Sequence, residues 1–166
     1  MIYLIWLLRI IHIVGGVFWV GSAVFMTVFV APTVGALGEP GQRFVGHLLN
    51  NTKFSTRMAI ASGLTILAGA ILYGLDARAG EAWLQSRFAI GLGIGAAFAI
   101  VGFVFGILVG RTTTAMAQLG GQFQGKPTAE QMTRMQGMQN QLRTYSIVNV
   151  ASLLLATVFM AIARYL

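Results

Sequence analysis

The first apolar stretch of the sequence carries an arginine and a histidine three residues apart, Arg9 and His12. This spacing places both side chains on one face of a helix, and Gly16 and Trp19 continue that face. Ionisable side chains within a membrane-spanning helix are costly, usually face the bundle interior and often mark function. A neutral imidazole can bind heme iron or copper, or relay a proton. We therefore take these four residues as candidate cofactor-binding residues, with His12 as the candidate metal ligand.

Both ionisable residues also have a structural explanation. His12 can be hydrogen-bonded to a neighbouring helix, and Thr65, Asn149 and Ser152 are the candidate partners. Arg9 can pair with a propionate or a phosphate, or it can simply extend its charge to the membrane interface. The other histidine, His47, lies in a polar segment expected toward the opposite side of the membrane. A second axial ligand would then be Met, Tyr, water or a residue of another chain.

A second pattern is a face of small residues in the third apolar stretch. The steps between them are three or four residues, so all lie within roughly a third of the helix circumference. Small residues let helix backbones approach closely in a membrane. The face indicates packing within the chain or, alternatively, contact with a second copy or another membrane subunit. These candidate helix-packing residues are Gly91, Gly95, Ala99, Gly102, Gly106 and Gly110.

The elements that must position these residues follow from the composition. Of the 166 residues, 57% are hydrophobic and only 9% are charged, whereas a soluble domain carries roughly a quarter charged residues. Lipid must therefore be the solvent for most of the chain. We expect an all-α integral membrane protein, a single domain over residues 1–166, with four spans in an antiparallel bundle. The expected spans are about 2–31, ending at Pro32, then 58–75, 88–110 and 147–162.

Two connections are expected to be helical extensions of the spans. Thr128 resembles an N-cap with Gln131 three residues later, as in a capping box, so one helix would lead directly into the fourth span. Residues 40–58 would likewise extend the second span. The bundle would then project beyond the membrane on the side of the first and third loops.

The net charge of +7 comes from basic residues that lie between the apolar stretches. They indicate topology and anionic lipid rather than nucleic acid. We expect the protein in the cell membrane, the inner membrane of a bacterium. The positive-inside rule places its first and third loops in the cytoplasm and both termini on the outer side. The basic residues of these two loops are Arg43, Lys53, Arg57, Arg111, Lys126, Arg134 and Arg143.

Residues for autonomous catalysis are missing from the sequence. The chain has no cysteine, and its four acidic residues, Glu39, Asp76, Glu81 and Glu130, all lie in loops or at their edges. No paired carboxylates, zinc motif or phosphate-binding glycine loop occurs. An autonomous enzyme is not expected, and redox chemistry would have to come from a cofactor.

The segment LLRIIHIVGGVFWVGSAVFM resembles the opening span of two bacterial membrane-protein families. The resemblance rests on His12, Trp19 and Gly21 and covers about 30 of 166 residues. Its likeness to HemJ-like protoporphyrinogen oxidases implies a b-type heme ligated by His12. Its likeness to CopD-like copper-resistance proteins implies copper handling, although this chain lacks a second histidine within a span.

Three hypotheses of function remain at the level of sequence. The first is a heme-binding or redox-associated membrane protein built around His12. The second is a cofactor-free accessory subunit that assembles with a larger membrane complex or with copies of itself. The third is the handling of copper or of a small solute.

Overall fold

The structure, a computed structural model, describes residues 2–123 and 127–166. Four of its helical segments are long and apolar enough to cross a membrane. They are Ile2–Leu37, Phe54–Ala77, Arg87–Gly121 and Ala129–Tyr165. The chain is therefore helical with four candidate spans, as expected of a multi-pass membrane protein.

The first segment does not end at Pro32, contrary to the expectation from sequence. Helix α1 (Ile2–Phe25) continues through a π-helical turn, η1 (Met26–Val30), into α2 (Ala31–Leu37). A proline has no amide hydrogen and its ring crowds the carbonyl four residues earlier. The wider turn directly before Pro32, in which the Ala31 amide bonds the Met26 carbonyl, accommodates that defect without breaking the helix.

The expected extension of the second span is broken into two helices. Helix α3 covers Glu39–Asn51 and α4 covers Phe54–Ala77. Between them Lys53 adopts a left-handed conformation with φ of 53°, which ends one helix and redirects the chain. Gly38, with φ of 62°, makes the preceding corner between α2 and α3.

The last two long helices begin with side-chain caps. Ser86 accepts a hydrogen bond from the Ala89 amide at the start of α6 (Arg87–Gly121). Thr128 and Gln131 form a capping box at the start of α7 (Ala129–Ile162), which confirms both the predicted cap and the continuous helix. Short elements complete the chain: α5 (Glu81–Leu84) and the 3-10 turn η2 (Ala163–Tyr165).

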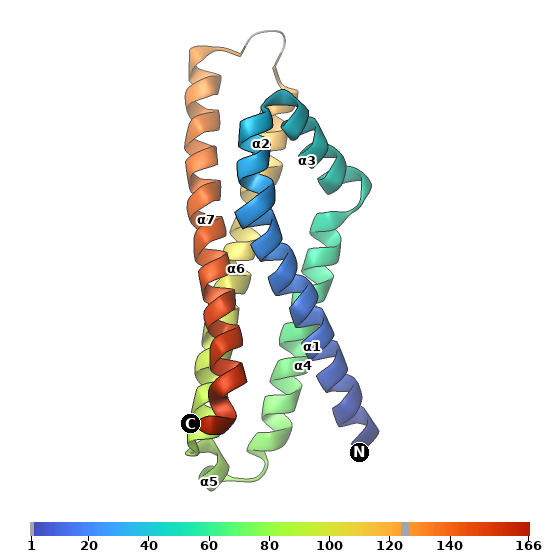
Figure 1. Cartoon of the computed structure of the whole chain (residues 1–166), viewed down its shortest axis with the longest axis vertical. Helices are drawn as coiled ribbons and strands as arrows, with labels where there is room; N and C mark the ends of the chain where they lie inside the picture. Colours follow the sequence, from blue (N-terminus) through green and yellow to red (C-terminus); the bar gives the residue numbers. More distant parts are fainter. Residues whose placement is uncertain (1, 124–126) are drawn as a thin grey trace.

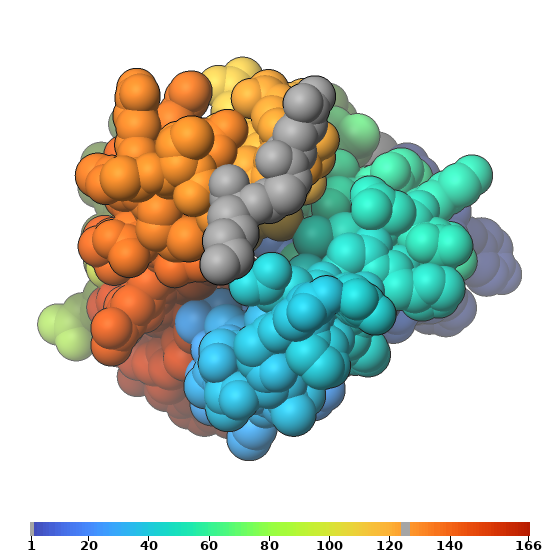
Figure 2. Space-filling model, turned by 90° about the horizontal axis from the view of Figure 1, so that it is seen from above, coloured from blue at the N-terminus to red at the C-terminus, as the bar shows by residue number. Residues whose placement is uncertain are grey.

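The long helices pack as two pairs. His12 lies against Gly69, and Gly15 against Ala61 and Thr65, so α1 and α4 run in opposite directions. Helices α6 and α7 are likewise opposed and lie side by side (Figure 1). Both termini and α5 lie at one end of the molecule, and the α2–α3 corner lies at the other (Figure 1). Figure 2 looks onto the latter end, where α2 and α3 form one lobe and the start of α7 forms another.

A small core joins the two pairs. Trp19 and Ala23 of α1 meet Val150 and Leu153 of α7 in one buried cluster, and the ring of Phe103 from α6 stands edge-on to Trp19. Most other large apolar side chains point outward, which suits a lipid environment.

Candidate functional site

His12 lies half-buried where α1 packs against α4. Its Nδ1 is 2.8 Å from the main-chain oxygen of Thr65. A carbonyl oxygen can only accept, so Nδ1 carries the proton and donates it. In the neutral ring Nε2 then holds the lone pair. Over residues 2–123 and 127–166, Nε2 has no hydrogen-bond partner.

The space for the imidazole is provided by a glycine on the opposite helix, Gly69. A Cβ at this position would stand 2.7 Å from Cε1 and 2.8 Å from Nδ1 of His12. Only a residue without a side chain lets the ring come so close to α4. The sequence pointed to Gly16, on the same helix face as His12, and not to Gly69, which the structure places against the ring.

Two neighbouring glycines of α1 set the distance between the same helices. A Cβ on Gly15 would stand 2.6 Å from the hydroxyl oxygen of Thr65, whereas one on Gly16 would make an ordinary contact of 3.6 Å with the Thr65 methyl group. Gly15 is thus the residue that close packing requires. The Thr65 hydroxyl that it covers is buried and has no hydrogen-bond partner in the described part of the chain.

Arg9 does not form a buried pair with His12. Its side chain is exposed. No carboxylate lies within ion-pair distance of it among the described residues. Its guanidinium is free to meet an anionic group at the surface of the bundle.

Trp19 has a different role from His12. It is 4% exposed and belongs to the core that joins α1 to α6 and α7. Seven residues of helix separate it from His12, a rise of roughly 10 Å. We therefore assign Trp19 to packing between the helix pairs rather than to the candidate cofactor site.

His12 is the one candidate metal ligand that the described residues place at this position. His47 is exposed on α3, which Figure 1 places toward the end remote from the chain termini. No group of three His, Cys, Asp or Glu side chains that could hold a metal ion occurs in the described residues. One imidazole with a fixed tautomer fits the axial ligand of a heme, since a metal-binding histidine characteristically donates its other N–H to a carbonyl or carboxylate. It does not by itself make a copper cage.

The small-residue face of α6 packs against α7 for most of its length. A Cβ on Gly91, Gly95 or Gly102 would stand 2.7–2.8 Å from side-chain atoms of Leu166, Met160 or Leu153. Gly110 meets nothing within 4 Å, and Ala99 is half-buried. The face is therefore largely occupied within the chain, and only its last position is open.

A buried hydrogen bond fixes the register of this packing. The side-chain amide of Asn149 on α7 donates to the main-chain oxygen of Gly102 on α6 over 2.6 Å. A Cβ on Gly106 would stand 3.3 Å from the same amide nitrogen. Asn149, a candidate partner of His12 in the sequence, is thus committed to α6.

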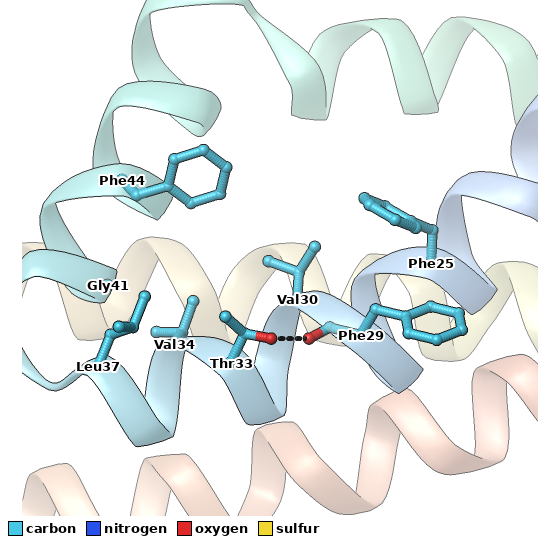
Figure 3. A pocket seen from close by; sticks show the side chains of 8 residues that line it. All are labelled: Phe25, Phe29, Val30, Thr33, Val34, Leu37, Gly41 and Phe44. Atoms are coloured by element: carbon cyan, nitrogen blue, oxygen red, sulfur yellow. Dashed lines mark hydrogen bonds between the residues drawn. The ribbon is translucent and has the colours of Figure 1, made fainter.

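An apolar groove lies between α3 and the segment that contains the π-helical turn. Its volume is about 220 Å³, and Figure 3 shows Phe25, Phe29, Val30, Thr33, Val34, Leu37, Gly41 and Phe44 around it. The one side-chain hydroxyl among them, on Thr33, donates to the Phe29 carbonyl over 2.7 Å. The groove offers no titratable group for chemistry.

Comparison with known proteins gives no match: no protein-family model, curated protein or solved structure is similar to this chain. The resemblance to HemJ-like and CopD-like proteins thus rests on His12, Trp19 and Gly21 alone. Of these, Trp19 is a core residue, and Gly21 is exposed with nothing within 4 Å of a Cβ placed on it. His12 is the part of the motif with chemistry to offer.

Proposed function

We propose that this protein is a multi-pass protein of the cell membrane, the inner membrane of a bacterium, that binds one b-type heme through His12. The observation that carries the proposal is the hydrogen bond from Nδ1 of His12 to the Thr65 carbonyl. It fixes the tautomer and ring orientation and leaves the Nε2 lone pair for the iron. Gly69 supports this geometry because it leaves room for the His12 ring, and Gly15 supports it because it lets Thr65 pack closely against α1.

Arg9 supplies a second element of the proposed site. It lies one turn before His12 on the same helix face and is exposed. A guanidinium forms charge-assisted hydrogen bonds with carboxylates, so Arg9 would hold a propionate. Bound heme would supply one-electron redox chemistry. The chain itself binds and orients the group, and we do not propose that it is an autonomous enzyme.

For the membrane arrangement we propose an antiparallel four-helix bundle with the first and third loops in the cytoplasm. Helices α6 and α7 have 35 and 34 residues, or about 50 Å each, against a hydrocarbon core of about 30 Å. Their polar ends would project on the cytoplasmic side. The excess of basic residues in the same two loops supports this orientation.

The proposal is tested by the heme content of protein purified from heme-replete cells. We expect a Soret band in the wild type, and its loss in His12→Ala with the helical content unchanged. His47→Ala is the matched control and should keep the band, since His47 lies on α3 away from the site. A colourless, correctly folded wild type would refute heme binding, and metal analysis of that preparation would test the copper alternative.

A cofactor-free accessory subunit is the second candidate, and the surface of α1 favours it. Large apolar side chains are exposed along this helix, and Tyr3 and Val17 are 76% and 70% exposed. This surface would pack against another membrane subunit or a second copy. The expected result is then a colourless preparation that co-purifies with a partner or forms oligomers, and in which His12→Ala changes neither property.

A further inference from the structure

A second groove lies between the start of α4 and the later part of α6. Ser55 of α4 forms one wall, and α6 provides the other with Ile107, Gly110, Arg111, Thr114, Ala115 and Gln118. The groove is open and has a volume of about 370 Å³. It differs from the apolar groove beside α3 because a cation and several polar side chains line it.

The polar side chains of this groove are available to a ligand. The Arg111 side chain is exposed and has no carboxylate within ion-pair distance in the described ranges. The side chains of Ser55 and Gln118 form no hydrogen bond with any described residue. The Thr114 hydroxyl, in contrast, donates to the Gly110 carbonyl over 3.0 Å. The Arg111 guanidinium can only donate, and Ser55 and Gln118 can each donate as well, so the groove can bind an oxyanion.

The charge around the groove is positive. Lys53 and Arg57 are close to Ser55 in the chain but do not line the groove, and Arg111 is the cation among its lining residues. The acidic residue of the neighbouring α3, Glu39, is bonded to Arg43 over 2.6 Å. Neither α4 before Asp76 nor any part of α6 contains an acidic residue.

The position of Arg111 along α6 indicates the level of the groove relative to the membrane. It follows Arg87 by 24 residues, or about 36 Å, so the two arginines bracket a hydrocarbon core of about 30 Å. Arg111 then lies at the level of lipid phosphates. Ile107, one turn earlier, lies about 6 Å deeper, at the level of the acyl chains.

We propose that this groove binds the headgroup of an anionic phospholipid. Arg111 pairs with the phosphate, Ser55 and Gln118 donate to phosphate or headgroup oxygens, and the acyl chain passes over Ile107. Basic pockets between membrane helices bind anionic headgroups in this way. The combination of a cation at headgroup depth with an apolar surface below it favours a lipid over free phosphate.

The test is native mass spectrometry of the purified protein titrated with phosphatidylglycerol or with phosphatidylcholine. We expect the wild type to retain phosphatidylglycerol in preference, and Arg111→Gln to weaken this binding about fivefold. Ala115→Phe, which fills the groove without changing the charge, should cause a similar loss. Arg78→Gln, at the opposite end of the chain's second span, is the control and should bind as the wild type does.

Two results would overturn the proposal. One is equal retention of phosphatidylglycerol by the wild type, Arg111→Gln and Ala115→Phe. The other is displacement of the lipid by millimolar glycerol phosphate, which would show that a soluble phosphate is sufficient. If Arg111→Gln does not fold, Ala115→Phe decides the matter alone. None of these outcomes depends on whether heme binds at His12.

Discussion

His12 is held through one ring nitrogen, and the other remains available. The sequence correctly pointed to Thr65 as a candidate partner, but the acceptor is its main-chain carbonyl rather than its hydroxyl. A main-chain acceptor depends on helix register, which residue identities alone do not reveal. Gly69 was missed for the same reason, because its role is to face a particular ring across an interface.

At the residue scale we expect Gly69→Ala to lower the free energy of unfolding by about 1–3 kcal/mol. The added Cβ would stand 2.7 Å from the His12 ring and would force the ring away from the Thr65 carbonyl. Unfolding in mixed detergent micelles measures the effect. Gly74→Ala is the control on the same helix, since a Cβ there meets nothing within 4 Å. Equal stability of the two variants would contradict the packing described.

At the scale of elements, features set by a few neighbouring residues could be predicted from the sequence. The way the helix accommodates a proline could not. The capping box of Thr128 and Gln131 lies within four residues and was predicted. Pro32 was expected to end a helix, but the π-helical turn before it absorbs the missing hydrogen bond. The left-handed Lys53 is an uncommon conformation for a residue other than glycine, and the sequence around it gives no sign of it.

The glycines of α6 give the prediction that belongs to this scale. We expect Gly102→Leu to lower the stability of the single chain by about 3 kcal/mol or more, because the fully buried Leu153 already fills that position. Gly110→Leu should leave stability unchanged or slightly raised, since leucine favours a helix more than glycine does. Thermal unfolding in detergent compares them.

This pair of variants also separates folding from assembly. The face from Gly91 to Gly106 is occupied by α7 and the chain end, so Gly102→Leu should act on the monomer. A Gly102→Leu variant of normal stability but altered oligomer size would contradict this assignment.

At the scale of the whole molecule, outward-facing apolar side chains dominate and the core is small. The existence of four spans was therefore the most predictable feature, because it depends on composition over about 20 residues at a time. The pairing of α1 with α4 was not predictable, since it depends on particular contacts such as those of Gly15 and Gly69.

Orientation is the prediction for the whole molecule. Because the sequence has no cysteine, single cysteines can be introduced at Gln42, in the first loop, and at Ala79, in the second. We expect an impermeant maleimide to label Ala79→Cys in intact cells and Gln42→Cys only after lysis. The reverse pattern would place the first and third loops outside and would contradict the basic-residue argument.

The most direct test of the central claim is chemical rescue at His12. Replacing His12 by glycine opens a space beside Gly69 in which free imidazole can stand for the missing side chain. We predict that His12→Gly lacks the Soret band of the wild type and that imidazole restores it. A wild type without heme, or a His12→Gly variant that keeps its Soret band without imidazole, would contradict the account.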